Sequence, residues 1–165
     1  MQQRFIVLFS FILLCIPAFS QSTYPKITGY VSIVHPIITF SGQQATTNFK
    51  NYYIVGMPTG INIWKSTKVG FSMEFVPYIK AENGSSKMTN FLFHPGALFA
   101  LGKGFTFIGR AAFETAGRYG LTAVLNKTII KSKNCSYFLA IPLPVRFGND
   151  KPTSLTFGFQ FGIAF

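Results

Sequence analysis

Side chains able to perform acid–base or ionic chemistry are few in this 165-residue sequence, which contains only four Asp and Glu residues and two His residues. Several of them fall at even-numbered positions of segments that alternate between large apolar residues and small or polar ones. Charged groups persist inside a protein only when they are paired. We therefore predict an interior polar network on the even face. Its predicted members are Glu74, His94, Arg110, Glu114, Arg146 and Gln160.

Each of the two histidines is followed by a proline, at His35-Pro36 and His94-Pro95. Proline cannot donate a hydrogen bond to a sheet, so each pair predicts a local irregularity such as a β-bulge. His35 lies near Ser41, and such a pair can supply the base and the nucleophile of acyl transfer. No acidic partner lies nearby in the sequence, and no nucleophile motif, metal-ligand cluster, phosphate-binding loop or redox motif is recognisable. We therefore expect no enzyme activity, catalytic residue, metal or cofactor.

Eight segments with period-two alternation would position these side chains. They span residues 26–40, 52–64, 69–80, 88–101, 105–115, 118–130, 136–147 and 154–165. Each holds roughly 11 to 15 residues, which is long for a globular strand and suits a tilted membrane-spanning one. Turn-forming residues separate the segments, as expected for antiparallel strands that follow one another.

The odd face of these segments is rich in phenylalanine, for example Phe71 and Phe75 in the third segment. A soluble barrel would place its apolar face inside, but this face is too bulky for the interior of eight strands. An outward apolar face needs lipid, and in lipid each unpaired backbone group at an open sheet edge costs several kcal/mol. The predicted fold class is therefore all-β, an eight-stranded antiparallel transmembrane β-barrel formed by one domain, residues 21–165. Its narrow interior would be plugged by the polar network.

Residues 1–20 have the pattern of a signal peptide. Arg4 precedes an apolar run, and Ala18 and Ser20 are small residues at the positions that a signal peptidase reads, so we expect cleavage before Gln21. The run is shorter than the roughly 20 apolar residues that a transmembrane helix needs. After cleavage Cys135 would be the single cysteine, which excludes an intramolecular disulfide.

The sequence is strongly basic, with 15 Lys and Arg residues against four acidic ones and a net charge of +11. The cations are spread singly or in small groups between the apolar segments. A nucleic-acid partner would call for a basic stripe or helix, so this spacing argues against one. The spacing suits turns that meet anionic lipid headgroups, where each nearby cation contributes about 1 kcal/mol.

Two prolines of the seventh segment, Pro142 and Pro144, have the same parity. Both missing N–H groups would therefore face the same neighbouring strand. We predict that one seam of the sheet is weak there, either as a bulged or water-satisfied stretch or as a place that opens to lipid or to a partner.

The chain closes on Leu155-Thr156-Phe157-Gly158-Phe159-Gln160-Phe161-Gly162-Ile163-Ala164-Phe165. Together with the signal peptide and the eight segments, this ending resembles the small outer-membrane β-barrels of the OmpA and OmpX type. Members of that class close with an aromatic-rich strand and a terminal Phe that the barrel-assembly machinery recognises. The resemblance implies that Phe157, Phe159, Phe161 and Phe165 form such an assembly signal.

The resemblance further implies a bacterial outer-membrane location with outer-membrane lipids as surroundings and the barrel-assembly machinery as a partner during insertion. We expect a structural or interaction role, through an unknown protein partner at the loop of residues 41–51 and at the loop around Asn83-Gly84. Two other functions are compatible with such a barrel. They are porin-like passage of small solutes and, less favoured, an outer-membrane lipid acyltransferase or deacylase.

Overall fold

The computed structural model describes residues 24–165, so the predicted signal peptide lies outside the described residues. Among residues 24–165 every regular element is a β-strand. The strands are β1 (Lys26–Ser41), β2 (Gln44–Thr47), β3 (Tyr53–Gly56), β4 (Thr59–Trp64), β5 (Val69–Glu82), β6 (Ser85–Gly102), β7 (Phe105–Glu114), β8 (Tyr119–Lys131), β9 (Ser136–Phe147) and β10 (Ser154–Ala164). Residues 24–165 contain no helix long and apolar enough to span a membrane.

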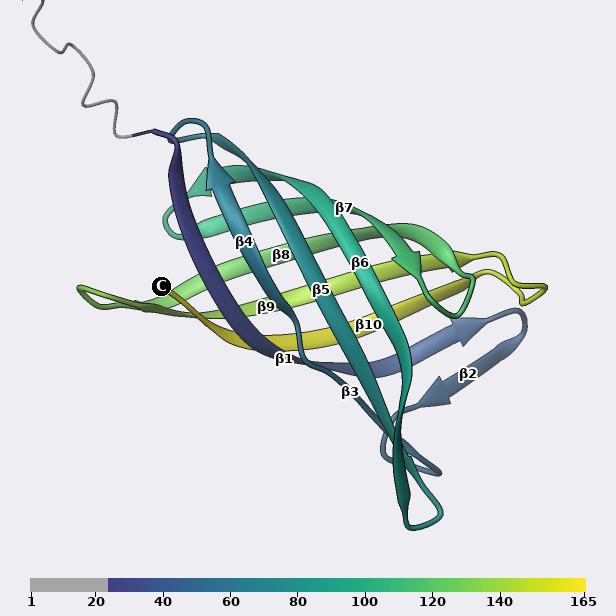
Figure 1. Ribbon diagram of the computed structural model, residues 1–165. Coiled ribbons are helices and arrows are strands. Elements are labelled where there is room, and N and C mark those ends of the chain that lie inside the picture. Colours follow the sequence, from purple (N-terminus) through teal and green to yellow (C-terminus); the bar gives the residue numbers. More distant parts are fainter. Residues whose placement is uncertain (1–23) are drawn as a thin grey trace, which may run out of the picture.

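The strands form one antiparallel sheet that closes on itself (Figure 1). Each strand from β5 to β9 pairs with the next one along the chain, and β10 returns to pair with β1 from Tyr30↔Ala164 to Ser41↔Ser154. Closure leaves no long free edge around the ring. The prediction of an all-β antiparallel sheet is confirmed.

The prediction of eight strands is wrong in detail, because the sheet has ten. The predicted segment 52–64 is divided into β3 and β4 at Met57-Pro58, and both parts lie between β1 and β5. Pro58 has no N–H for the ladder, and its carbonyl instead accepts a hydrogen bond from Ser32 N at 2.9 Å. The second addition is β2, which folds back on the end of β1 within the predicted loop 41–51.

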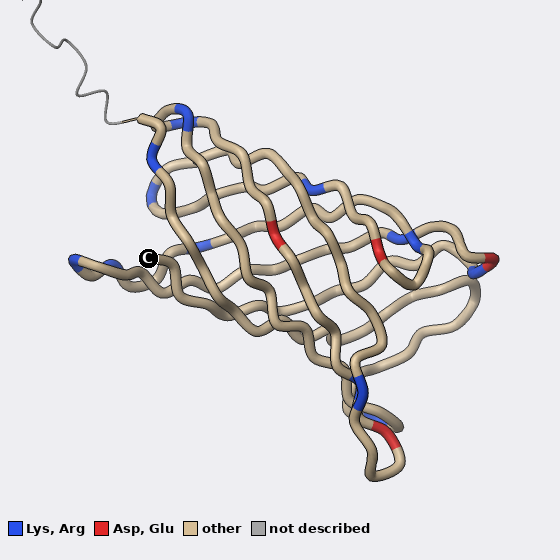
Figure 2. Tube along the Cα trace, viewed as in Figure 1, with Lys and Arg blue, Asp and Glu red and all other residues tan. Residues whose placement is uncertain are grey.

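Side chains alternate between the two faces of the sheet as predicted. Phenylalanines, leucines and isoleucines at odd positions are exposed on the outside, among them Phe71, Phe107 and Leu125. Charged residues gather at the two ends and in the loops, and few lie along the middle of the strands (Figure 2). The outer surface of the ring is therefore a broad apolar band between charged ends.

The interior is more apolar than the sequence suggested. One buried cluster comprises Tyr30, Leu98, Ile108, Val124, Phe138 and Ala140. A second comprises Val34, Val76, Leu92 and Ala112. These side chains pack inside the ring next to the polar residues and fill part of its narrow interior.

The two His-Pro pairs both mark irregular pairing, in different ways. At Pro36 the register of β1 against β10 shifts, which is a bulge. At His94-Pro95 the pairing of β6 with β7 is interrupted between Phe93↔Phe113 and Gly96↔Arg110, without a shift of register.

The predicted weak seam lies between β9 and β10. The pairing stops after Leu155↔Val145 and resumes at Gln160↔Ala140 with the same register, so Pro142 and Pro144 fall in the gap. The pairing of β8 with β9 continues through both prolines, which places their missing N–H groups on the β10 side. Gly158 fits this seam because a Cβ atom there would lie 3.0 Å from Pro142 Cγ.

Amide hydrogen exchange should reveal the consequence of this gap. We expect the amides of residues 155–159 in β10 to exchange faster than those of residues 106–110 in β7, where both neighbouring strands are paired. Local opening needs less free energy where ladder hydrogen bonds are missing. Equal protection of the two stretches would show that the seam is as strong as the others.

Candidate functional site

A buried carboxylate at the middle of the ring, Glu74 of β5, is the centre of the polar network. Its side chain is 3% exposed. Tyr30 Oη donates a hydrogen bond to Oε2 at 2.8 Å. His94 Nδ1 lies 2.9 Å and Arg110 Nη1 3.2 Å from Oε1. Three donors from β1, β6 and β7 thus surround one carboxylate, which ties together strands far apart in the sequence.

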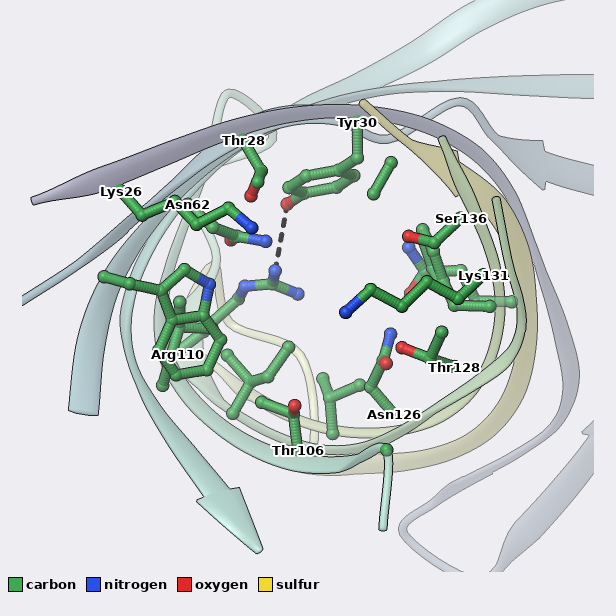
Figure 3. A pocket seen from close by; sticks show the side chains of 18 residues that line it. Lys26, Thr28, Tyr30, Asn62, Thr106, Arg110, Asn126, Thr128, Lys131 and Ser136 are labelled. Atoms are coloured by element: carbon green, nitrogen blue, oxygen red, sulfur yellow. Dashed lines mark hydrogen bonds between the residues drawn. The ribbon is translucent and has the colours of Figure 1, made fainter. Parts of the chain in front are cut away.

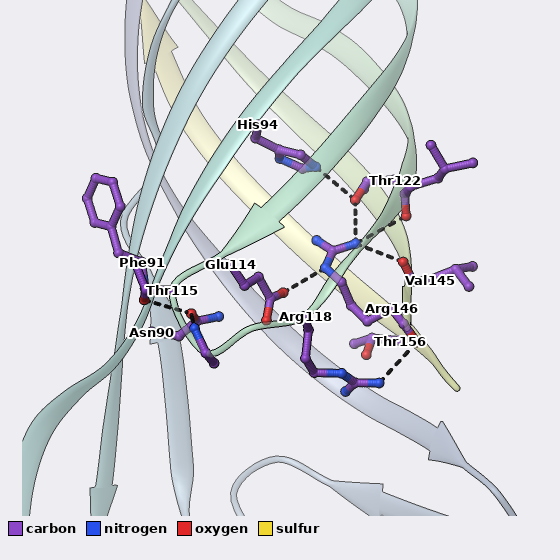
Figure 4. Close-up of polar contacts among 12 residues, drawn as sticks. Asn90, Phe91, His94, Glu114, Thr115, Arg118, Thr122, Val145, Arg146 and Thr156 are labelled. Atoms are coloured by element: carbon purple, nitrogen blue, oxygen red, sulfur yellow. Dashed lines mark hydrogen bonds and ion pairs between the residues drawn. The ribbon is translucent and has the colours of Figure 1, made fainter. Parts of the chain in front are cut away.

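The second ion pair joins Arg146 of β9 to Glu114 of β7, with Nε donating to Oε1 at 2.7 Å (Figure 4). Arg146 Nη1 also donates to the carbonyl oxygens of Leu121 and Val145, both at 3.1 Å, and to Thr122 Oγ1 at 3.0 Å. The guanidinium group is therefore held in one orientation by four acceptors.

Thr122 and His94 connect the two ion pairs. Thr122 Oγ1 accepts a hydrogen bond from Arg146 and lies 2.9 Å from His94 Nε2. A hydroxyl that accepts from arginine has its proton free to donate to Nε2, so Nδ1 of a neutral imidazole can donate to Glu74. With His94 neutral, two carboxylates balance two guanidinium groups, and the interior network carries no net charge.

Small residues make room for the largest members of the network. A Cβ atom at Gly60 would lie 2.5 Å from Tyr30 Oη, and one at Gly96 would lie 2.5 Å from Arg110 Cγ. The Tyr30 hydroxyl accepts from Arg110 Nη2 at 2.9 Å, and Ser72 Oγ accepts from the same nitrogen at 3.1 Å. Glycine at these two positions is therefore required by the close approach.

Five of the six predicted network residues are joined by hydrogen bonds and ion pairs, whereas Gln160 borders the same small cavity without a bond to them. Gln160 Nε2 donates to Ser32 Oγ at 2.8 Å, and Ser32 Oγ donates to the Pro58 carbonyl at 3.2 Å. Within residues 24–165 no hydrogen bond joins this pair to the ion-pair network. Through these two hydrogen bonds, Gln160 links β10 to β1 and to the break between β3 and β4.

Three network members were missing from the predicted set: Tyr30, Ser72 and Thr122. Ser72 and Thr122 lie at even positions, and that parity is a signal that could have found them. Tyr30 also lies at an even position, but a tyrosine near the start of a strand is equally typical of the membrane interface. Only the register of β1 against β4 reveals that its hydroxyl reaches Glu74.

The network divides the interior into two larger cavities. At its own level the free space is about 30 Å³, bordered by Glu74, His94, Arg110, Thr122 and Arg146 among others. Such a volume holds only about one or two water molecules. A cavity of about 430 Å³ lies on the side of Lys26 and Ala164, and one of about 260 Å³ on the side of Asn90 and Arg118.

The predicted assembly residues lie on the outer face of β10 and at its end. The side chains of Phe157, Phe159 and Phe161 are exposed between 41% and 45%. Phe165 follows β10 and continues its pairing, since its N–H donates to Gly29 O at 2.9 Å and its oxygen accepts from Gly29 N at 2.8 Å. These positions present a row of aromatic rings on the surface.

The histidine and serine of the enzyme alternative have different partners. His35 Nδ1 lies 3.2 Å from Tyr53 Oη, and its ring packs beside Phe49 and Tyr53. Ser41 Oγ donates to Pro152 O at 3.4 Å. In the described part of the chain no three His, Cys, Asp or Glu residues gather as metal ligands.

No protein-family model and no curated protein matches the chain. Among solved structures, the chain is similar to one described as "De novo design of transmembrane beta-barrels". The similarity has a TM-score of 0.45 and 14% sequence identity, over 84% of this chain and 93% of that chain. A likeness at this level supports no conclusion about function.

Proposed function

We propose that this chain is an integral protein of the bacterial outer membrane, a plugged β-barrel with a structural or interaction role. The observation that carries the proposal is the outward apolar band. It includes Phe71, Phe75, Phe99, Phe107, Leu125, Ile141, Phe157 and Phe161, each between 39% and 45% exposed. A soluble monomer rarely exposes a contiguous apolar surface larger than a few hundred Å². Lipid is the surrounding that removes this cost.

The contents of the interior support the same proposal. A soluble barrel would use its largest apolar side chains inside, whereas here both ion pairs are inside and most phenylalanines are outside. Each carboxylate of the network is paired with a guanidinium group, and a low-dielectric surrounding requires such pairing of buried charges. The network leaves about 30 Å³ at its level, so we propose a plug rather than a small-solute channel.

An interaction role is supported by the loops at the end opposite to the large cavity. The β5–β6 hairpin extends beyond the ring (Figure 1). Its tip forms an open groove of about 540 Å³ with residues 49–53. The groove borders Phe49, Tyr52 and Tyr53, and aromatic rings of this kind are enriched in protein interfaces. We propose this groove as the place for the protein partner.

Asn48 holds that loop in place. Its side-chain amide donates to Ile54 O and accepts from Ile54 N, both at 2.7 Å, while its own N–H donates to Ile37 O at 3.0 Å. The side chain thereby imitates a paired strand residue between β1 and β3, which share only the pair Val34↔Gly56. A loop fixed in this way is preorganised for binding.

The proposed assembly role of Phe157, Phe159, Phe161 and Phe165 rests on their common outward face. Deleting Phe165 removes its two hydrogen bonds to Gly29 and the last ring of the row. We expect slower insertion in cells while the purified variant still refolds in detergent. Normal insertion of the deletion variant would remove the assembly role.

Two measurements test the proposed function. We expect the chain without residues 1–20 to partition into detergent or vesicles rather than buffer, because the apolar band needs cover. We also expect no steady conductance in planar bilayers, because the plug is closed. Recovery of folded protein from detergent-free buffer would refute the membrane location, and a stable open-channel current would replace the plug with a channel.

A further inference from the structure

The 430 Å³ cavity opens at the end of the ring where Lys26 and Ala164 lie (Figure 3). Its size falls within the roughly 300 to 1,000 Å³ typical of small-molecule sites. Hydroxyl and amide side chains from six strands or their ends line it, including Thr28, Asn62, Thr106, Asn126 and Ser136. The polar network forms its floor through Arg110, so the cavity is a cup with one mouth rather than a passage.

The charged side chains that line this cup are all positive. Lys26, Lys131 and Arg110 line it, and no Asp or Glu does. Figure 3 shows the amino group of Lys131 reaching toward the centre of the ring, with Lys26 at the opposite wall. Arg110 is balanced by Glu74, but no ion pair involves Lys26 or Lys131 among residues 24–165. Two unbalanced cations at one mouth favour an anion between them.

Two buried polar atoms of the cup also lack partners. Arg110 is 4% exposed, and its Nε finds no hydrogen-bond acceptor. Asn62 Oδ1 is likewise buried without a donor. Both atoms lie beneath the cavity surface, so a ligand would instead meet the hydroxyl and amide groups that line the cavity. Such a lining matches a ligand that carries hydroxyl groups, because hydroxyl groups can both accept and donate.

We propose that this cup binds a small, hydroxyl-rich anion, of which a sugar phosphate is the simplest example. The anionic group would lie between Lys26 and Lys131, and the hydroxyl groups would meet the amide and hydroxyl side chains below. Trp64, also in the lining, offers a flat apolar surface with a polar edge to the ring of such a ligand. The site depends on the closed ring alone and not on a surrounding membrane.

Trp64 makes the test direct, because it is the single tryptophan of the chain and borders the cavity. The protein, refolded in a detergent with an uncharged headgroup, is titrated with glucose 6-phosphate, gluconate, inorganic phosphate and glucose while Trp64 emission and binding heat are recorded. We expect saturable binding of glucose 6-phosphate or gluconate, and at least about tenfold weaker binding of glucose and of inorganic phosphate. The preferred anion distinguishes a phosphate from a carboxylate ligand.

Lys26→Gln and Lys131→Gln should each weaken binding by roughly fivefold, because each removes one partly exposed cation near the anion. Lys87→Gln, a matched change in the β5–β6 hairpin at the other end of the ring, should leave affinity unchanged. Circular dichroism and the emission of the unliganded protein establish that each variant is folded. The proposal would be overturned if neither glucose 6-phosphate nor gluconate produced a Trp64 response or binding heat. Equally tight binding of glucose, or equal weakening by Lys87→Gln, would overturn it as well.

Discussion

Glu74→Gln is expected to lower the free energy of unfolding by about 3–5 kcal/mol, the usual effect of breaking a buried ion pair from one side. The substitution keeps the shape of the side chain but removes its charge. Arg110 would then be a buried cation without a counterion, and Tyr30, His94 and Arg110 would face an amide in place of a carboxylate that accepts from all three. Denaturant unfolding in lipid vesicles measures the change.

Glu82→Gln is the matched control for this experiment. Glu82 forms an ion pair with Lys80 at 2.7 Å, a shorter separation than the 3.2 Å between Glu74 and Arg110. Its side chain is 42% exposed, against 3% for Glu74. Exposed ion pairs contribute about 0–1 kcal/mol, so the control should change stability little. Equal effects of the two variants would mean that Glu74 is not part of a buried network.

A loss of the plug is the functional side of the same prediction. Without the Glu74 charge, Arg110 is held at the centre of the ring only by its hydrogen bonds to Tyr30 and Ser72, so the 30 Å³ space at that level can widen more easily. We expect brief conductance events for Glu74→Gln in planar bilayers and none for Glu82→Gln.

The sequence predicted which residues face the interior of the ring, because side chains alternate between the two faces all along a strand. Once β5 places Phe71 and Phe75 outside, Glu74 must lie inside, and the same rule places His94, Arg110, Glu114 and Arg146. Parity also allowed the weak seam to be predicted from Pro142 and Pro144. These features depend on single strands, and a single strand can be read from its own residues.

Features that depend on neighbouring strands could not be read in this way. The meeting of Tyr30 with Glu74 requires the register of three strands, β1, β4 and β5. The split of the predicted segment 52–64 involves Pro58 accepting a hydrogen bond from Ser32 of the neighbouring strand β1. Gln160 has the parity of the network and borders the same small cavity, but its amide donates to Ser32 of the neighbouring strand β1 instead. The odd or even position of a residue in a strand predicts which face of the sheet its side chain lies on. It does not predict which residues that side chain contacts.

The outward face offers the second large effect. Leu125 lies at the middle of β8 with its side chain 43% exposed, and Leu101 lies near the end of β6 with its side chain 61% exposed. In a bilayer we expect Leu125→Arg to lower the free energy of unfolding by about 2–4 kcal/mol, because arginine at the midplane loses its hydration. Leu101→Arg should cost only about 0–1 kcal/mol, because arginine near the interface reaches water. Unfolding in vesicles compares the two.

The difference between these variants separates the membrane proposal from its soluble alternative. Both positions are outward leucines and receive the same residue, so lost packing affects them similarly. On a surface in water, exposed substitutions usually change stability by less than about 0.5 kcal/mol at any height. A soluble ring would therefore show two small and equal effects. Only a surrounding whose polarity changes along the strand makes the middle of β8 more costly than the end of β6, so equal effects would refute a lipid-facing band.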